Sequence, residues 1–340
     1  MTRAFFVLFL VVFLCTACAT GTSPTATTIT MIGTNDVHGQ LLPDDNRGGL
    51  TSISAYVQAV RAARAADGGH VLLIDAGDMW QGTLESNLTE GASVVAAFNA
   101  LGYDAVAVGN HEFDFGPVGP KAIPSSPDDD RRGALKERAR EANFPLLSAN
   151  LAYKDTGKLV DWPNVKASTM IAVGDYKVGV IGVLTSRALA ATIAANVDDL
   201  VVLPLAPAII REATALRAAG ANLVIVTAHA GGRCEEFDDP RDLSSCHSDS
   251  EIFRVAREVP NGLVQHIFAG HVHEGIAHVV NGISITSALS STRAFSRVDF
   301  VLDNGEVVER RIARPHKGVV AGDYEGVALL PVAAVVEVAE

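Results

Sequence analysis

Five short segments of the chain combine aspartate, asparagine and histidine side chains in patterns that suit metal binding. They are Asp36-Val37-His38, Gly77-Asp78, Gly109-Asn110-His111-Glu112, Ala228-His229 and Gly270-His271-Val272-His273. Carboxylate, amide and imidazole groups without thiolates suit Zn, Mn, Fe or Ni rather than an iron–sulfur cluster. Alternate side chains of an extended segment lie on one face, so both members of Asp36-x-His38 reach one cavity. The pattern predicts a metal centre.

Each of these segments follows a predicted strand. Short β-branched runs predict strands at Thr28–Gly33, Val71–Asp75, Ala105–Val108, Pro145–Ser148, Met170–Val173, Lys177–Val183, Leu223–Thr227, Val264–Phe268, Ile283–Ser287, Arg297–Leu302 and Val307–Ala313. Alanine-rich runs predict helices at Leu50–Ala66, Ala92–Leu101, Arg132–Ala142, Pro204–Ala219 and Ser250–Val259. Because ligands bind beyond the carboxyl ends of strands in open α/β sheets, the five segments are expected to converge at one edge.

Glycines and turn sequences refine this picture. A glycine precedes each of Asp78, Asn110 and His271, where it lets the backbone turn sharply or approach the ions closely. Asn281-Gly282 and Asn304-Gly305 are typical of tight hairpin turns, so the C-terminal third is expected to be antiparallel. No repeat or change in composition divides the chain, which favours one layered α/β domain.

The five segments resemble the motif blocks of calcineurin-like metallophosphoesterases. Within that superfamily, Asp36-Val37-His38-Gly39, Gly77-Asp78-x-x-Gln81-Gly82 and Gly109-Asn110-His111-Glu112-Phe113-Asp114 are most similar to the bacterial 5′-nucleotidase and 2′,3′-cyclic phosphodiesterase branch. The resemblance covers a catalytic domain at 28–314. It implies a four-layer αββα sandwich with mixed sheets and a two-metal site.

The resemblance also implies a role for each site residue. Seven residues would bind two divalent ions, Zn, Mn, Fe or Ni: Asp36, His38 and His273 for one ion, Asn110, His229 and His271 for the other, and Asp78 for both. A bridging carboxylate is physically reasonable, because two neighbouring cations repel each other and need an anion between them. His111, oriented and kept protonated by Asp114, would stabilise phosphoryl charge and assist the leaving oxygen. Glu112 is expected to support the site rather than act as an acid catalyst.

The function implied is hydrolysis of phosphomonoesters or cyclic phosphodiesters, nucleotides among them, by metal-bound hydroxide with His111 assisting. Two alternatives stay open. One is a surface binding module that keeps the metals without turnover, and the other is a thiosulfonate hydrolase on the same fold. Arg233 and Arg293 could meet a phosphate or be ordinary surface residues. Residues 315–340 are expected to be a tail or the start of a linker, too short for the second substrate-binding domain that members of this branch carry.

Composition limits the possible partners. The 340 residues include 27 Lys and Arg against 39 Asp and Glu, which gives a formal charge of −12. With 48% apolar and 19% charged residues, the chain is typical of a folded protein. The acidic balance argues against nucleic-acid polymers and basic contacts with anionic lipid. A small phosphoester substrate would therefore need a local positive centre, which two divalent ions would supply.

The N-terminus predicts export. Arg3, the apolar run from Ala4 to Cys15 and the small residues that follow are typical of a signal peptide at 1–17. Cys15-Thr16-Ala17-Cys18 resembles a lipoprotein box that would anchor the protein through Cys18, whereas Ala17-Cys18-Ala19 fits a cleavage site that would release it. Residues 18–27 would form a flexible tether. The expected location is the periplasm or the cell surface, and the only membrane contact expected is the lipid anchor.

Export also bears on the cysteines. Cys234 and Cys246 lie twelve positions apart in the exported part of the chain. In an oxidising compartment they are expected to form a disulfide, with two free buried thiols as the alternative.

Overall fold

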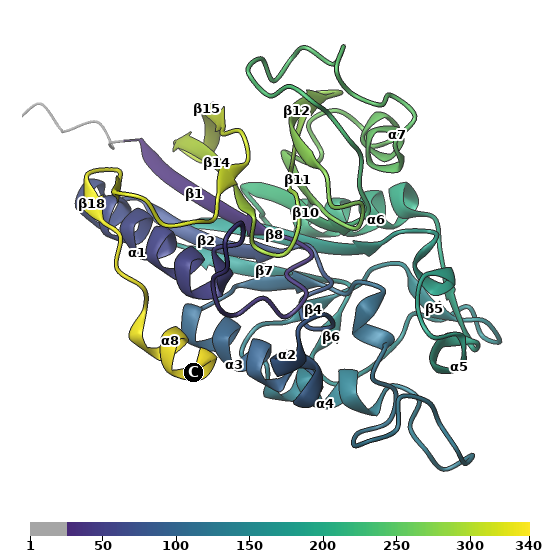
Figure 1. The fold of residues 1–340 in the computed structure, drawn as a ribbon. Coiled ribbons are helices and arrows are strands. Elements are labelled where there is room, and N and C mark those ends of the chain that lie inside the picture. Colours follow the sequence, from purple (N-terminus) through teal and green to yellow (C-terminus); the bar gives the residue numbers. More distant parts are fainter. Residues whose placement is uncertain (1–25) are drawn as a thin grey trace, which may run out of the picture.

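A large mixed sheet contains the first four and the last two of the predicted strands (Figure 1). Its order is β15-β14-β1-β2-β3-β4-β6, and β16 also pairs with β14. The parallel strands are β1 (Thr27–Thr34), β2 (His70–Asp75), β3 (Ala105–Ala107), β4 (Leu146–Leu147) and β6 (Val165–Lys166). The antiparallel strands are β14 (Ala294–Asp303), β15 (Glu306–Ile312) and β16 (His316–Lys317).

A second mixed sheet has the order β12-β13-β11-β10-β8-β7. Its parallel centre consists of β8 (Tyr176–Leu184), β10 (Leu223–His229), β11 (His266–Ala269) and β13 (Ile283–Ala288). Antiparallel edges are formed by β7 (Ser168–Val173) and β12 (Gly275–Val280). Two short pairs complete the strands: β5 (Leu151–Tyr153) with β9 (Leu200–Val202), and β17 (Asp323–Tyr324) with β18 (Val327–Ala328).

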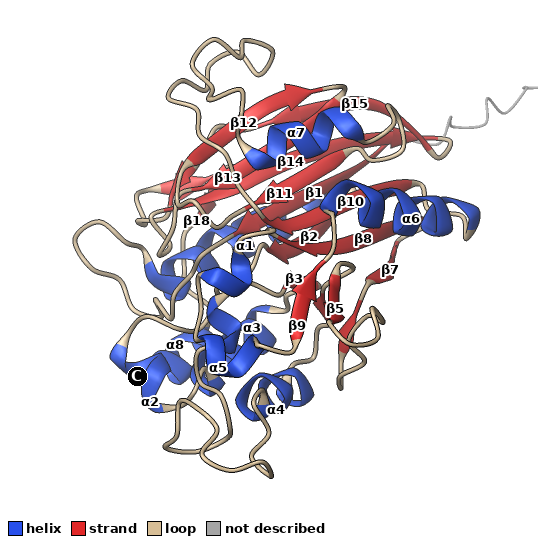
Figure 2. Ribbon diagram, turned by 90° about the vertical axis from the view of Figure 1, so that its right-hand side faces the viewer, coloured by secondary structure: helices blue, strands red, loops and turns tan. Residues whose placement is uncertain are grey.

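The two sheets pack face to face, and helices cover their outer faces. Apolar side chains of both sheets, such as Met31, Ile225 and Phe268, form one buried cluster between them. Outside the first sheet pack α1 (Gly49–Asp67), α3 (Ala92–Leu101) and α4 (Gly133–Glu141). Outside the second sheet pack α6 (Leu205–Ala218) and α7 (Glu251–Glu258), as Figure 2 shows. This arrangement confirms the predicted αββα sandwich with mixed sheets.

This computed structural model describes residues 26–340. Residues 1–25 lie outside the described residues. They include the signal peptide predicted at 1–17, Cys15, Cys18 and the predicted tether at 18–27 up to residue 25. Within residues 26–340, no helix is both long and apolar enough to cross a lipid bilayer.

All the predicted strands and helices are present, with ends displaced by at most three residues. Both predicted hairpins are also present, joining β12 to β13 and β14 to β15. At their turns Asn281 and Asn304 have φ angles of 50°, as tight two-residue turns require. β12 was not predicted, although the Asn281-Gly282 turn needs a strand before it. The short strands β5, β6, β9, β16, β17 and β18 were not predicted either, nor were α2 (Leu84–Leu88), α5 (Ala194–Val197) and two 3-10 turns at His111–Phe113 and Ala188–Ala190.

The chain beyond Ala313 packs onto the sandwich. After β16, the helix α8 (Ala333–Ala339) joins the apolar cluster of α1 and α3, and Val335 is fully buried there. The backbone N–H of Val332 donates to Ser54 Oγ on α1 at 2.9 Å. The last predicted strand ended at Ala313, so the fold extends further than expected. The division of the chain at residue 314 stays a prediction.

The structure joins Cys234 to Cys246 by a disulfide, which confirms that pairing. The bridge closes a loop that follows β10 and contacts the start of β12, where the Cys234 N–H donates to the Gly275 carbonyl at 3.1 Å. It therefore braces the loop next to the segment that contains His271 and His273.

Replacing both cysteines, Cys234→Ala and Cys246→Ala, should lower the free energy of unfolding by about 2–4 kcal/mol, because the unfolded chain loses its cross-link. Urea unfolding followed by circular dichroism measures this. Reductant should lower the stability of the wild type to the level of the variant and leave the variant unchanged. Equal stability of the oxidised wild type and the variant would contradict the prediction.

Candidate metal centre

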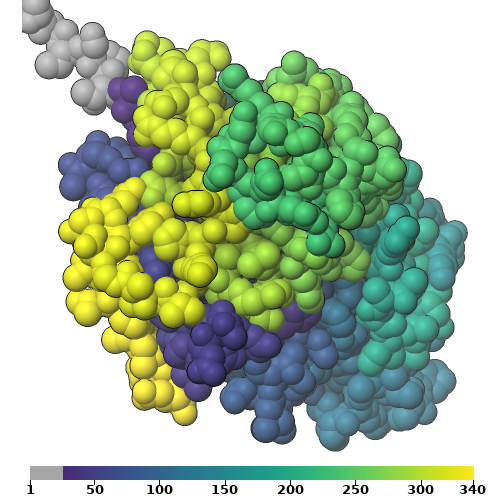
Figure 3. Space-filling view, turned by 45° about the horizontal axis from the view of Figure 1, so that its top comes forward, coloured from purple at the N-terminus to yellow at the C-terminus, as the bar shows by residue number. Residues whose placement is uncertain are grey.

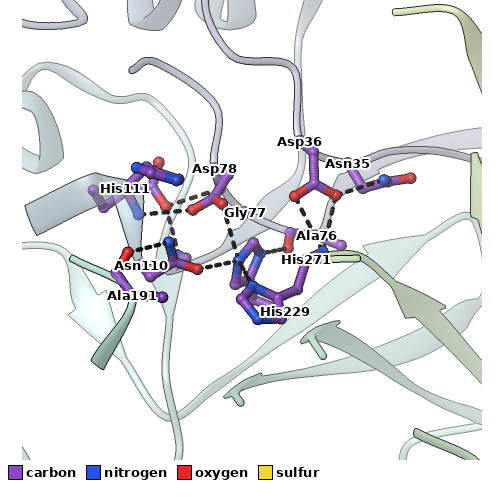
Figure 4. Close-up of polar contacts among 12 residues, drawn as sticks. Asn35, Asp36, Ala76, Gly77, Asp78, Asn110, His111, Ala191, His229 and His271 are labelled. Atoms are coloured by element: carbon purple, nitrogen blue, oxygen red, sulfur yellow. Dashed lines mark hydrogen bonds and ion pairs between the residues drawn. The ribbon is translucent and has the colours of Figure 1, made fainter. Parts of the chain in front are cut away.

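The candidate metal ligands lie at the carboxyl ends of five parallel strands of the two sheets or in the loops that follow them. Their side chains approach one another across the junction of the sheets, as Figure 4 shows for most of them. The loops after β1, β2, β3 and β11 provide, in that order, Asp36 and His38, Asp78, Asn110 and His111, and His271 and His273, and His229 is the last residue of β10. The expected convergence at the carboxyl ends of the strands is therefore present.

Five of the seven candidate ligands have a left-handed backbone. Residues other than glycine rarely adopt positive φ angles, and those that do are enriched at functional sites. Hydrogen bonds between neighbouring loops hold this conformation: the Asp36 N–H donates to the Gly77 carbonyl at 2.9 Å and the His38 N–H to the Asp78 carbonyl at 3.0 Å. The φ angles are 49° at Asp36, 51° at His38, 57° at Asp78, 76° at His271 and 60° at His273.

The glycines before the ligands leave space that a side chain would fill. A Cβ atom on Gly109 would lie 2.2 Å from Asp78 Oδ1, and one on Gly77 would lie 2.9 Å from His229 Nδ1. Gly77 also has a φ of 89°. The backbone therefore approaches neighbouring atoms closely at these two glycines, as expected. The neighbouring atoms belong to candidate ligands, namely Asp78 at Gly109 and His229 at Gly77.

A first group of acceptors consists of Asp36, His38 and His273. The Nε2 atoms of His38 and His273 lie 3.0 Å apart, and His273 Nε2 lies 3.4 Å from Asp36 Oδ1. His38 Nδ1 lies 2.7 Å from the Gln81 carbonyl, which only accepts hydrogen bonds. Nδ1 therefore donates to that carbonyl, and Nε2 is the ring nitrogen directed at the group.

A second group surrounds His229, which is fully buried. Its Nε2 lies 3.1 Å from Asp78 Oδ2, 2.9 Å from Asn110 Oδ1 and 3.2 Å from His271 Nδ1. Its Nδ1 donates to the Ala76 carbonyl at 2.8 Å, so Nε2 is the ring nitrogen that faces these groups (Figure 4). Four atoms able to bind a metal ion thus face one small space.

The pKa values show that this space favours positive charge. Burial opposes the charged form of His229, but attraction to Asp78 outweighs it and raises the pKa to about 10. Burial likewise opposes the charge on Asp78, but His229 and its neighbours outweigh it and hold the pKa of that carboxyl well below its usual range. Either a proton on His229 or a bound metal cation would balance the negative charge of Asp78. The donor set therefore fits divalent ions.

His111 lies beside these groups but forms a different contact. Its Nδ1 lies 2.5 Å from Asp114 Oδ2, and this hydrogen bond raises the pKa of His111 to about 9 although burial opposes it. Thr192 Oγ1 donates to the other oxygen of Asp114 at 2.7 Å and fixes the carboxylate. Sequence reasoning found the His111–Asp114 pair. It missed Thr192, which lies far along the chain in a segment without a motif.

Glu112 supports the site by accepting hydrogen bonds from the backbone of two ligand loops. Its buried carboxylate accepts the N–H groups of Asp78 and Met79, both at 2.9 Å, and of Gly109 at 2.5 Å. It thereby joins the loops after β2 and β3. Burial raises the pKa of Glu112 to about 7 despite these hydrogen bonds. Its contacts agree with the supporting role expected of it.

The two arginines singled out in the sequence lie in different surroundings. Arg233 is half-exposed and pairs with Glu235 at 3.2 Å, so it is an ordinary surface residue here. Arg293 lines a cavity next to His273.

Comparison with known proteins relates this site to other chains. The family model described as Calcineurin-like phosphoesterase matches residues 29–275. The chain is 28% identical to Protein UshA of Escherichia coli over 302 residues, which is 82% of this chain and 50% of that protein. It is 36% identical to Snake venom 5′-nucleotidase of Gloydius brevicauda over 169 residues, which is 47% of this chain and 26% of that protein.

A solved structure shows the same fold. The calcineurin-like phosphoesterase YfkN of Bacillus subtilis superposes with a TM-score of 0.68 at 17% identity, covering 92% of this chain and 96% of that chain. The curated relatives are longer, since this chain spans only a quarter to a half of their length.

The Glu112→Gln substitution should lower the free energy of unfolding of the metal-free protein by about 3 kcal/mol. The new amide keeps one acceptor oxygen, but its NH2 group would face a buried backbone N–H. Urea unfolding in EDTA measures the loss. Glu337→Gln, on the exposed side of α8, removes a carboxylate in the same way and should change stability by less than about 0.5 kcal/mol. Equal effects of the two substitutions would show that the Glu112 contacts contribute nothing.

Proposed function

The chain belongs to the calcineurin-like phosphoesterase family, and on that premise we propose that it is a dinuclear phosphoesterase that hydrolyses phosphomonoesters or cyclic phosphodiesters, nucleotides among them. The observation that supports this most is the convergence of two acceptor groups beside a protonated histidine. Each group has the side chains for one divalent ion, and His111 stands next to both.

Two ions would occupy the two groups. Asp36, His38 and His273 would hold one ion, Asn110, His229 and His271 would hold the other, and Asp78 would bridge them. When bound, divalent ions polarise phosphoryl oxygens and make water a stronger nucleophile. The protein contributes the orientation: hydrogen bonds to Gln81 and Ala76 fix the ring nitrogens of His38 and His229 before any ion binds.

His111 is proposed to act on the substrate directly. Asp114 occupies its Nδ1, so Nε2–H is free to donate to an oxygen of the scissile phosphate. The raised pKa keeps the ring protonated at neutral pH, where its charge stabilises the negative charge that develops on the phosphoryl and leaving oxygens.

Nucleotides are proposed as substrates because two of the matched relatives are named 5′-nucleotidases. Export is proposed from the N-terminal sequence, with a signal peptide at 1–17 and Cys18 as the proposed site of a lipid anchor. The Cys234–Cys246 disulfide supports an oxidising location such as the periplasm or the cell surface.

Removal of metal should abolish activity. Dialysis against EDTA should lower kcat/KM for p-nitrophenyl phosphate at least about 100-fold, and Mn²⁺ or Zn²⁺ should restore it. The wild type should bind two equivalents of metal by elemental analysis, and Asp78→Asn should bind less and lose activity. His247→Gln, an exposed histidine outside the site, is the control and should keep both.

Metal content together with the identity of the released product separates the alternatives. Two bound ions without hydrolysis of any phosphoester would indicate a metal-containing binding module. Release of sulfate from a thiosulfonate, without phosphoester hydrolysis, would indicate a thiosulfonate hydrolase. Either result contradicts the proposed function.

His111→Ala should lower kcat by about 10²–10⁴-fold while the metal content stays at the wild-type level. Asp114→Asn should lower kcat less and move its alkaline limb to lower pH. The reason is that the carboxylate raises the pKa of His111, so without it the ring loses its proton earlier as pH rises. pH profiles of kcat measure this. A parallel loss of metal in His111→Ala would instead make His111 a ligand.

A further inference from the structure

A wide cavity of about 1800 Å³ opens beside the first acceptor group, with His273 in its wall. Three segments far apart in the sequence line it, at 44–47, 289–293 and 314–321. Figure 3 shows the yellow C-terminal segment beside the purple N-terminal segment on this face of the molecule. The cavity therefore adjoins the candidate metal centre and has room for the leaving group of a substrate whose phosphate lies there.

The segment 289–293 is held on both sides. The Ser291 N–H donates to the carbonyl of the candidate ligand Asp36 at 2.7 Å, and the Gly318 N–H donates to the Arg293 carbonyl at 2.8 Å. On its other face Thr292 Oγ1 accepts the Gly49 N–H at 2.8 Å. Three of its residues have positive φ: 63° at Leu289, 50° at Ser291 and 56° at Thr292. Strained backbone fixed in this way is typical of a functional site.

The third segment is also anchored. β16 pairs with β14, and the His316 ring stacks on Phe295 with ring centroids 4.9 Å apart. Tyr56 of α1 contacts the same imidazole at 4.9 Å and donates its hydroxyl to the Val319 carbonyl at 2.9 Å. Lys317 therefore projects from a fixed strand.

The cavity has more positive than negative side chains. Its wall contains four cations and two carboxylates: Arg47, Arg293, Arg314, Lys317, Asp44 and Asp45. Arg47 lies 3.6 Å from Asp44, and Arg314 has only a distant contact with Asp238 at 3.7 Å. The Arg293 guanidinium donates to the carbonyl and hydroxyl of Ser290. Between residues 26 and 340, no acidic side chain pairs with Arg293 or Lys317, so both charges are available to a ligand.

From this arrangement we infer that the cavity binds the leaving group of the substrate and favours leaving groups that have their own phosphate or carboxylate. Arg293 and Lys317 would recognise that second anion, because guanidinium and ammonium groups bind both kinds of oxyanion. The inference rests on the proposed phosphoesterase function. In the reaction, water forms a bond to phosphorus, the ester P–O bond breaks, and the leaving alkoxide takes up a proton, giving inorganic phosphate and an alcohol that retains the second anion.

Matched substrates test the inference. Phenyl phosphate and 3-carboxyphenyl phosphate differ by a carboxylate on the leaving group, and adenosine 5′-monophosphate and adenosine 3′,5′-bisphosphate differ by a phosphate. For each pair, kcat/KM is measured on the metal-loaded protein. The value for the substrate with the second anion is then divided by the value for the substrate without it. The wild-type ratio should be at least about ten at low salt in one or both pairs, and the pair concerned identifies the preferred anion.

Arg293→Gln with Lys317→Gln should lower that ratio about tenfold. Both side chains are exposed, so the substitutions remove charge without removing buried packing. Lys158→Gln, at an exposed lysine that does not line the cavity, should keep the wild-type ratio. Wild-type ratios near one in both pairs, or ratios that the double variant does not change, overturn the inference while phosphoester hydrolysis persists. Absence of hydrolysis of all four substrates overturns the proposed function and this inference together.

Discussion

The rest of this structure depends on the close approach of several metal-binding atoms around His229. His229 Nε2 faces a carboxylate oxygen, an amide oxygen and a second imidazole nitrogen within 3.2 Å, in a fully buried position. Such groups repel unless a positive charge lies between them. The fold holds these groups together with left-handed backbone at five ligands and with hydrogen bonds to Glu112 and Ala76. The site is consequently shaped before a cation arrives, which lowers the cost of ordering it on binding.

The sandwich explains why two sheets are needed. The first acceptor group takes Asp36 from the loop after β1 and His273 from the loop after β11, which belong to different sheets. The second group likewise combines Asp78 of one sheet with His229 of the other. The apolar layer around Phe268 that fixes the sheets against each other therefore also fixes the distances between ligands. The net charge of −12 need not prevent anion binding, because divalent cations bound here would make the site locally positive.

Motifs and strand patterns predicted most of this arrangement, because ligands at strand ends are brought together by any parallel sheet. The backbone angles of Asp36 and His271 could not be predicted, since they depend on hydrogen bonds between loops distant in sequence. Nor could the packing of α8, whose valines favour strands locally but become helical against α1 and α3. Lys317 had no motif, and only the pairing of β16 with β14 places it beside the cavity.

Anomalous X-ray diffraction from crystals soaked in Mn²⁺ tests the central claim most directly. Two anomalous peaks about 3.5–4 Å apart are predicted. One should contact Asp36, His38 and His273, the other should contact Asn110, His229 and His271, and Asp78 should reach both. A single peak, or peaks outside these two groups, would contradict the account.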